Sequence, residues 1–392
     1  MAERVKPFQE SVIREMTRLG DETGAVNLSQ GLPDFDPPQE ILDAAKQAIY
    51  GKKNQYTFPF GSIDFREAVA QKTIEYNRIP TDPENEVTVT CGVSEAVMVA
   101  MLAHTDPGDE VIIFEPWYEN YVPDCYMAGV NPVFFEQELP NYEIDFDRLK
   151  KLINSRTRLI IINTPQNPNG KIFSKKELEK MAEFCQKHSL ILVSDEIYEH
   201  ITYDSYPHIS PASIEGMKAQ AVTISGLGKT YSVTGWRVGW MVASPELTGP
   251  MRKVHDYLTV CAPAPFQAAG IKALSMPQSY YKDMRKEYTK RRKIILEALE
   301  KAGMKYYIPR GAYYVMADFS QINWNRDKYS RESWTDDRAF AEYLAREIGV
   351  AVVPGNSFYM GADKGKSQVR FNFAKKESTL QQAVERLKRL KS

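Results

Sequence analysis

The sequence has few cysteines, no long apolar run and almost no net charge, and each of these features excludes a class of protein. Its four cysteines lie far apart, without the spacing of a metal site or of a disulfide framework. The formal net charge of −1 gives no excess charge that would favour nucleic acid or an anionic membrane. No apolar run approaches the ~20 residues of a membrane-spanning helix, and the charged start MAERVKPFQE predicts no signal peptide. We therefore expect a cytoplasmic protein without a membrane partner, a nucleic-acid partner or a bound metal.

Short apolar runs alternate with longer helical patterns between residues 86 and 225. The apolar runs are nearly continuous, which is typical of strands that are covered on both faces. Alternating strands and helices favour an α/β fold with a mostly parallel, doubly wound sheet. The predicted helices are 94–104 and 174–188, and the second begins with the capping-box pair Ser174 and Glu177. The predicted strands are 86–90, 110–115, 158–163, 190–195 and 221–225.

The end of the chain has a different pattern. A long, charged, amphipathic helix is predicted over 278–303, and the strands and helices that follow it lack the earlier regularity. We expect an N-terminal segment, 1–45, a large domain, 46–285, and a smaller α+β domain, 286–392. The N-terminal segment is expected to pack with the smaller domain.

Polar side chains follow three of the predicted parallel strands. Ligands of open α/β sheets bind beyond the carboxyl ends of the strands, so these side chains should line one crevice. A glycine turn between the strand at 86–90 and the helix at 94–104 adds backbone N–H groups that suit a phosphate. The side chains are Asn163 or Asn167, Asp195 with Tyr198, and Ser225 with Lys229.

The stretch GLGKT, residues 226–230, has two interpretations. It resembles the end of a phosphate-binding P-loop, whose motif requires a glycine five residues before the GK pair. That position is Thr223, which lies inside a predicted strand. The acidic strand that would hold magnesium also precedes the lysine, where a P-loop protein has it later. A nucleotide hydrolase is therefore disfavoured, and Lys229 is more simply explained as a covalent attachment point.

A lysine that forms a Schiff base with pyridoxal phosphate needs three kinds of help. An acid must keep the ring nitrogen protonated, and Asp195 is placed for this. A hydroxyl or amide must hydrogen-bond the 3-oxygen of the ring. Donors must also hold the phosphate. The candidates for the last two tasks are Tyr198 and Asn167, then Arg237, Ser225 and the turn Gly92–Val93–Ser94.

These motifs occur in the order of a known family. The chain resembles the class I/II, fold type I, pyridoxal-phosphate-dependent aminotransferases, and among them the aromatic, glutamine, kynurenine and aspartate aminotransferases. The most specific segment is GKTYSVTGWRVGW, residues 228–240. The others are NLSQGLPDFDPP (27–38), NQYTFPFGSIDFREAVA (54–70), NTPQNPNG (163–170), SDEIYEH (194–200), PRGAYYVMADF (309–319) and VRFNFAK (369–375).

The resemblance implies a role for each motif residue toward the cofactor. Lys229 bonds the cofactor, and Asp195 pairs with the ring nitrogen. Other residues are implied to contact the cofactor without a covalent bond. Tyr198 and Asn167 contact the 3-oxygen, and Tyr118 stacks on the ring, with Trp117 as the alternative. The phosphate is contacted by Arg237, Ser225, Val93 and Ser94. Many members have serine where this chain has Gly226, which leaves the phosphate contact of Ser225 open.

The resemblance also implies substrate contacts and a partner. Arg370 binds the substrate α-carboxylate as a bidentate fork, next to Asn167 and the backbone of Gly31. Tyr56 reaches the phosphate of a neighbouring subunit, so the resemblance implies a homodimer with shared active sites.

The implied reaction is transfer of an amino group from an L-amino acid to a 2-oxo acid such as 2-oxoglutarate. Some relatives that use dicarboxylates place a lysine near the position of Ser94, and this chain does not, so we expect aromatic, neutral or sulfur-containing donors. Aspartate aminotransfer and carbon–sulfur β-elimination are the alternatives. A non-enzymatic relative fused to a DNA-binding module is disfavoured because the resemblance begins by residue 27.

Overall fold

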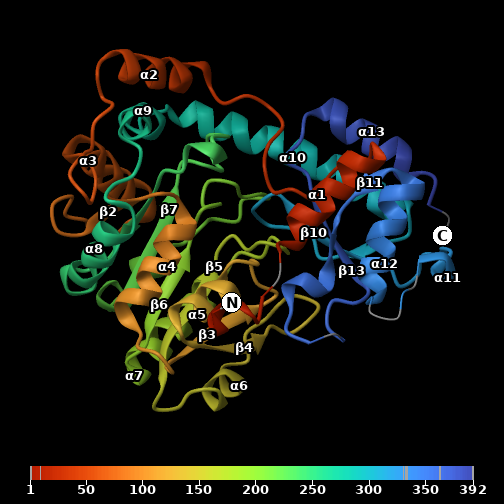
Figure 1. Cartoon of the computed structure of the whole chain (residues 1–392), viewed down its shortest axis with the longest axis horizontal. Helices are drawn as coiled ribbons and strands as arrows, with labels where there is room; N and C mark the ends of the chain where they lie inside the picture. The colour runs from red at the N-terminus through yellow and green to blue at the C-terminus, as the bar shows by residue number, and fades with distance from the viewer. Residues whose placement is uncertain (1, 9, 330, 332–333, 362, 391–392) are drawn as a thin grey trace.

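The structure is a computed structural model that describes residues 2–8, 10–329, 331, 334–361 and 363–390. Its larger sheet has seven strands in the order β2-β8-β7-β6-β5-β3-β4 (Figure 1). All are parallel except β8, which runs antiparallel to both of its neighbours. The prediction of a mostly parallel sheet is confirmed. The strands are β2 Val87–Thr90, β3 Glu110–Glu115, β4 Asn131–Glu136, β5 Thr157–Asn163, β6 Ile191–Asp195, β7 Ala221–Gly226 and β8 Gly239–Val242.

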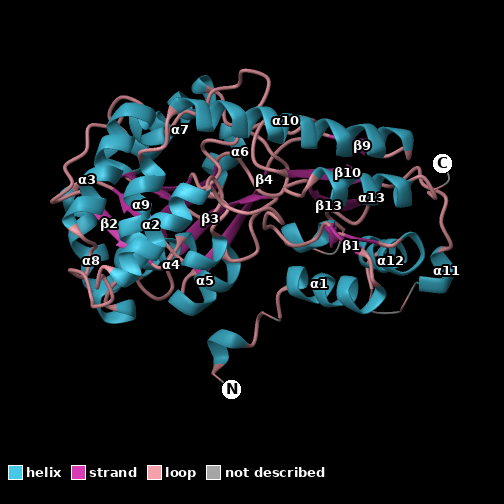
Figure 2. Cartoon of the chain, turned by 90° about the horizontal axis from the view of Figure 1, so that it is seen from above, coloured by secondary structure: helices cyan, strands magenta, loops and turns pink. Residues whose placement is uncertain are grey.

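Helices cover both faces of this sheet. In Figure 2, α4 and α5 lie on one side of the strands and α6 and α7 on the other. Most strand residues outside β4 are buried, because each face of the sheet packs an apolar core against these helices. Helix α7 begins with the predicted capping box of Ser174 and Glu177. The helices of this part are α2 Gln39–Tyr50, α3 Ile63–Lys72, α4 Val93–His104, α5 Tyr121–Ala128, α6 Phe146–Lys151, α7 Lys175–His188, α8 Pro245–Thr259 and α9 Ala264–Leu274.

A second, antiparallel sheet has the strand order β12-β13-β10-β9. The apolar stretch 350–354 forms two short strands: β11 pairs in parallel with β1 from the N-terminal segment, and β12 joins β13. Helix α1 packs on β11 and β12, beside the second sheet in Figure 1. These elements are α1 Val12–Thr23, β1 Val26–Asn27, α10 Gln278–Lys301, β9 Lys305–Tyr306, β10 Tyr314–Asp318, α11 Arg326–Tyr329, α12 Asp336–Tyr343, β11 Val350–Ala351, β12 Val353–Pro354, β13 Gln368–Asn372 and α13 Glu377–Leu387.

Two strands of the larger sheet, β4 and β8, were not predicted. Strand β4 lies at the sheet edge, begins with Asn131 and Pro132, and is only partly buried, so it lacks a continuous apolar signal. Strand β8 is short and starts with a glycine. The predicted boundaries at residues 45 and 285 stay predictions. Among the described residues, no helix is both long enough and apolar enough to span a lipid bilayer.

Candidate active site

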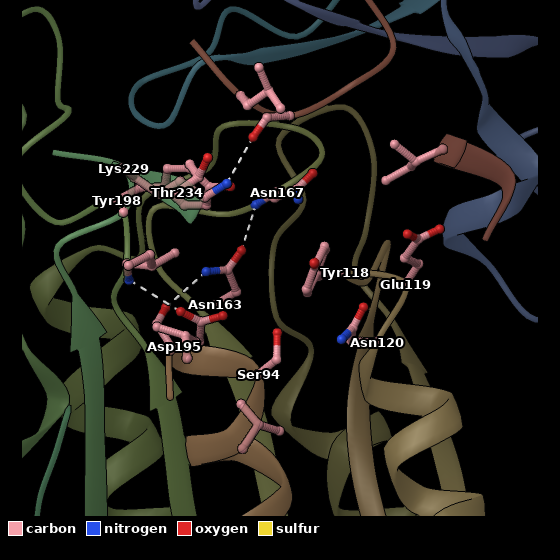
Figure 3. A pocket seen from close by; sticks show the side chains of 18 of the residues that line it. Ser94, Tyr118, Glu119, Asn120, Asn163, Asn167, Asp195, Tyr198, Lys229 and Thr234 are labelled. Atoms are coloured by element: carbon pink, nitrogen blue, oxygen red, sulfur yellow. Dashed lines mark hydrogen bonds between the residues drawn. The ribbon is translucent and has the colours of Figure 1, made fainter. Parts of the chain in front are cut away.

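A cavity of about 320 Å³ opens at the carboxyl ends of β5, β6 and β7 (Figure 3). This is the position where ligands bind in open α/β sheets. Residues of α1, of the segment 30–32 and of β13 complete its walls, so chain segments from both sheets contribute to it. The sequence-predicted residues that line it are Gly31, Val93, Ser94, Tyr118, Asn163, Asn167, Asp195, Tyr198, Lys229, Arg237 and Arg370.

Lys229 is a half-buried lysine in the wall of the cavity. Its Nζ donates to the carbonyl oxygen of Gly31 at 2.8 Å. Burial, followed by the positive charges of Arg370 and Arg237, lowers the pKa of Lys229 to about 8. About a tenth of this amine is therefore unprotonated at pH 7, far more than in an ordinary lysine, and this is the form that attacks a carbonyl or accepts a proton.

Asp195 ends β6 and lies on the cavity floor. Its Oδ2 accepts a hydrogen bond from the Tyr121 hydroxyl at 2.7 Å, and its Oδ1 accepts from the Ile197 N–H at 3.2 Å. Burial raises the pKa of Asp195 to about 6, while the Tyr121 bond acts in the opposite direction. A buried carboxylate that stays ionised at neutral pH is suited to hold a protonated ring nitrogen.

Asn163 and Asn167 both line the cavity but use their side chains differently. Asn163 donates from Nδ2 to the Asp195 carbonyl oxygen at 2.8 Å and accepts from the Asn167 N–H at 2.6 Å. It therefore fixes the backbone, whereas the side chain of Asn167 faces Arg370.

Val93, Ser94 and Arg237 form an anion cradle at the start of α4. Gly92 precedes this helix with φ 83° and ψ 172°. A Cβ on Gly92 would lie 2.3 Å from Arg237 Nη2, so the guanidinium rests directly on the glycine. The free N–H groups and the positive end of the helix dipole, together with Arg237, suit a phosphate group.

Arg370 on β13 is fully buried and reaches the cavity. Its Nη1 donates to Asn167 Oδ1 at 2.9 Å and its Nη2 to the Ser29 carbonyl oxygen at 2.6 Å. Its Nε is buried without a described hydrogen-bond partner. The guanidinium stands over the ring of Tyr314, with its Cζ 4.4 Å from the ring centroid. A planar, buried guanidinium facing a cavity is suited to a carboxylate.

Aromatic side chains complete the walls. The hydroxyl of Tyr198 is 3.1 Å from that of Tyr314, and burial raises the pKa of Tyr198 well above its usual value, so this phenol stays protonated. Tyr118 lines the cavity, as Figure 3 shows. Trp117 is instead buried against Phe134, with ring centroids 4.8 Å apart. Of the two rivals, Tyr118 is therefore the one that faces the cavity.

Two predicted residues lie elsewhere. The hydroxyl of Ser225 donates to Glu199 Oε1 at 2.6 Å, and Ser225 is not among the residues that line the cavity, so its expected phosphate contact stays a prediction that this arrangement does not favour. Successive side chains of a strand point to opposite faces, and Ile224 faces the α4 core. Tyr56 is 80% exposed and also lies outside the cavity of this single chain.

Several lining residues were missed by sequence reasoning. Tyr121 lies three positions after Tyr118 in PWYENY, a local signal that was available. Arg14 and Ser11 come from the start of α1, which only the tertiary fold brings to the cavity. Asp124 is 5% exposed with an unpaired Oδ2, and burial raises its pKa to about 7. The remaining missed residues include Glu119, Asn120 and Tyr314.

Comparison with known proteins identifies the family. A family model described as "Aminotransferase class I and II" matches residues 23–387. The structure of N-succinyldiaminopimelate aminotransferase from Mycobacterium tuberculosis superposes with a TM-score of 0.94, at 35% identity and 99% coverage of both chains. The methionine aminotransferase of Escherichia coli is 34% identical over 97% of this chain and 96% of its own length. The aspartate aminotransferase of Pyrococcus abyssi is 34% identical over 100% of this chain and 98% of its own length.

These matches span nearly the whole chain, and the cavity contains the lysine, aspartate and arginines that the sequence motifs singled out. The chain therefore belongs to the class I and II aminotransferases and has the fold type I architecture of that family.

Proposed function

We propose that this aminotransferase binds pyridoxal 5′-phosphate at Lys229 and moves the amino group of an L-amino acid to a 2-oxo acid by a ping-pong reaction. The observation that carries the proposal is the convergence of Lys229, Asp195, the Arg237 cradle and Arg370 on one cavity. When bound, the cofactor draws electrons from the α-carbon of the substrate, which makes the α-proton acidic.

The donor set of the cavity fits this cofactor. The α4 N-terminus with Arg237 would hold the phosphate, and Asp195 would pair with the ring nitrogen. Tyr198 and Asn167 would donate to the 3-oxygen. The ring face would lie against Tyr118. The Lys229 amine, with its pKa of about 8, is then suited to take the substrate α-proton as a base and to give a proton back as an acid.

Arg370 would bind the substrate α-carboxylate, because it is the buried guanidinium that faces the cavity with one nitrogen still unpaired. Asn167, held by Arg370, and the backbone of Gly31 would complete this subsite. Binding one carboxylate at this fixed point orients the α-carbon toward Lys229, and such orientation is a large part of catalysis.

The amino donor is proposed to be aromatic, neutral or sulfur-containing, with 2-oxoglutarate as acceptor. Support comes from the aromatic and apolar lining of the cavity, which includes Ile13, Leu32, Tyr118 and Tyr314. The E. coli relative named as a methionine aminotransferase is consistent with this choice.

Aspartate aminotransfer is the second candidate, and Arg14 is the observation that favours it. Its exposed guanidinium at the cavity wall is a further cation that a side-chain carboxylate needs. The P. abyssi relative is named as an aspartate aminotransferase.

We also propose that the enzyme is a cytoplasmic homodimer. The exposed aromatic side chains Tyr50, Tyr56, Phe58 and Tyr257, 60–93% exposed in the single chain, support a partner surface.

The test is the visible absorbance of the purified protein with single amino acids and no acceptor. The cofactor band should change on addition of the true donor and return on addition of 2-oxoglutarate. Lys229→Ala should abolish turnover, whereas Lys176→Ala, at an exposed lysine of α7, should not. Substantial turnover by Lys229→Ala would refute the proposal.

The same titration separates the substrate alternatives. A faster reaction of methionine or phenylalanine than of aspartate supports the first proposal. A faster reaction of aspartate supports aspartate aminotransfer, provided that Arg14→Gln abolishes this preference for aspartate. Pyruvate and ammonia released from a cysteine conjugate without an acceptor would identify a carbon–sulfur β-lyase.

A further inference from the structure

A second cleft of about 700 Å³ lies between α3, the π-helical turn Thr73–Asn77, α9 and the start of α10. It shares none of its described lining residues with the active-site cavity. Its volume is in the range of small-molecule sites. The proposed amino transfer takes place in the active-site cavity and assigns no function to this cleft.

The floor of the cleft holds an imidazole whose hydrogen bonds are unmade. His200 is 5% exposed, and neither of its ring nitrogens has a described partner. Its ring lies between those of Tyr76 and Tyr281, with centroid distances of 4.0 and 4.6 Å. Burial lowers the pKa of His200 to about 3, so the ring is neutral and offers one donor and one acceptor. An unpaired buried polar group costs about 1–3 kcal/mol, which a ligand at this position would recover.

The charges that face the cleft are mainly positive. Lys72, Arg78 and Arg285 line it, against the single acid Glu75. Lys72 is already used, because its Nζ donates to Glu199 and, at 2.8 Å, to Asn77. Arg78 and Arg285 form no ion pair with any residue that the structure describes. Two guanidinium groups are therefore available for an anion.

Four apolar residues form part of the lining, the Leu274 wall: Ala68, Ile271, Leu274 and Met276, from α3, α9 and the turn after α9. The polar residues Gln71, Ser275 and Gln278 also line the cleft. A small inorganic anion would leave this wall uncovered, whereas an organic acid would bury it. Burial of apolar area contributes roughly 25 cal/mol per Å².

The carboxylates behind the cleft do not form a free cation site. Oxygen and nitrogen atoms of Glu196, Glu199 and His208 lie within 4.8 Å of one another, which is close enough for a metal ion. However, the glutamates accept hydrogen bonds from Lys72, Asn77 and Ser210, so the lysine already supplies the positive charge. The ligand expected in the cleft is thus an anion rather than a cation.

The cleft also contacts the groups that hold the Lys229 segment. The Tyr281 hydroxyl is 2.7 Å from that of Tyr231, two residues after Lys229. Glu199, next to His200, accepts from Ser225, four residues before Lys229.

We propose that this cleft is a second ligand site, which binds a small organic carboxylate with an apolar body. Its carboxylate pairs with Arg285 and Arg78 and accepts from the His200 ring, and its body covers the Leu274 wall. This site goes beyond the proposed amino transfer and does not depend on it.

The test is calorimetric titration of the full-length enzyme, as purified, with 3-phenylpropionate. We expect the wild type to bind two equivalents per chain, one at Arg370 and one in the cleft. The double variant Arg78→Gln/Arg285→Gln should weaken one of the two sites at least about tenfold, the scale of a lost charged hydrogen bond. Lys286→Gln removes one positive charge from an exposed position of α10 outside the cleft and should keep both sites.

His200→Phe tests the imidazole separately and should weaken the same site as the arginine variant. The other site should be unchanged in both, which shows that they are folded. A single equivalent in the wild type whose affinity the arginine variant leaves intact, or two equivalents retained in the arginine variant, would overturn the proposal.

Discussion

Arg370 and Asn167, 203 residues apart in the chain, meet in the cavity through a hydrogen bond of 2.9 Å from Nη1 to Oδ1. Arg370 comes from β13 of the second sheet, and Asn167 from the loop that follows β5 of the first. The bond sets the plane of the guanidinium and leaves its buried Nε without a described partner. The proposed carboxylate subsite therefore depends on how the two sheets are joined.

Arg370→Lys should weaken substrate binding more than it slows the chemical step. A lysine keeps the charge but loses the planar fork, so it cannot pair with the carboxylate through two parallel hydrogen bonds. We expect the KM of the amino donor to rise about 10–100-fold, which corresponds to roughly 1.5–3 kcal/mol. Steady-state kinetics measure this, with Arg158→Lys at an exposed position of β5 as control. A wild-type kcat/KM in Arg370→Lys would contradict the carboxylate role.

Gly92→Ala should reduce affinity for pyridoxal phosphate. The φ and ψ of Gly92, 83° and 172°, lie in a region that is nearly exclusive to glycine and costs other residues about 1–3 kcal/mol. The new Cβ would also displace Arg237, whose Nη2 would be 2.3 Å away. Equilibrium dialysis should show a Kd at least about tenfold higher.

Gly249→Ala is the matched control, because its Cβ would meet nothing within 4 Å inside α8. It should leave the Kd unchanged; no gain in helix stability is expected, because the following Pro250 disfavours a side chain at this helical position. Equal affinities in the two variants would exclude the proposed cradle.

The site residues that could be predicted are those that lie within short, contiguous sequence motifs. Asp195 and Lys229 each follow an apolar strand, and parallel pairing brings such strand ends together, as in the register that places Asn163 beside Asp195. Ser225 shows the limit of this reasoning. A hydroxyl near Lys229 suggested a cofactor contact. However, side chains alternate between the two faces of a strand, and this directs the hydroxyl to Glu199, a partner that no local sequence pattern indicates.

Contacts between distant segments could not be predicted. Arg14 reaches the cavity because α1 packs on β11 and β12, and this packing depends on the whole second sheet. The hydrogen bond from Tyr121 to Asp195 likewise requires α5 to pack against the carboxyl end of β6. Sequence patterns give the elements and their faces, whereas these contacts depend on how the elements are placed in space.

Asp124 should make the protein less stable as the pH rises from about 4 to 7. Its pKa is raised to about 7 in the folded chain, against ~3.9 in an unfolded one. The folded state therefore binds the extra proton across this range, and its stability falls until the pH passes the folded pKa. Asp124→Asn removes the charge and should raise the Tm at pH 8 while changing it little at pH 5.

At pH 8, Asp124→Asn is expected to raise the free energy of unfolding by about 4 kcal/mol before relaxation of the structure, at ~1.36 kcal/mol per pKa unit. Asp195, with its pKa raised to about 6, also makes the folded chain less stable as the pH rises. In Asp124→Asn the decrease of stability with pH should therefore become smaller without vanishing. Thermal unfolding at both pH values measures it, with the exposed Asp147→Asn as control. An unchanged pH slope would show that Asp124 is not the buried acid responsible.

Tyr56 should act in the active site of a partner subunit rather than in its own. It is 80% exposed and lies outside the cavity of the single chain, so a contact with a bound phosphate requires a second copy. Tyr56→Ala and Lys229→Ala homodimers should both be impaired. A heterodimer of the two variants, isolated with two different affinity tags, contains one site with both intact residues and should recover about half of the wild-type activity. A heterodimer no more active than its parents would place Tyr56 in the site of its own chain or outside catalysis. A monomer in sedimentation analysis would remove the shared site altogether.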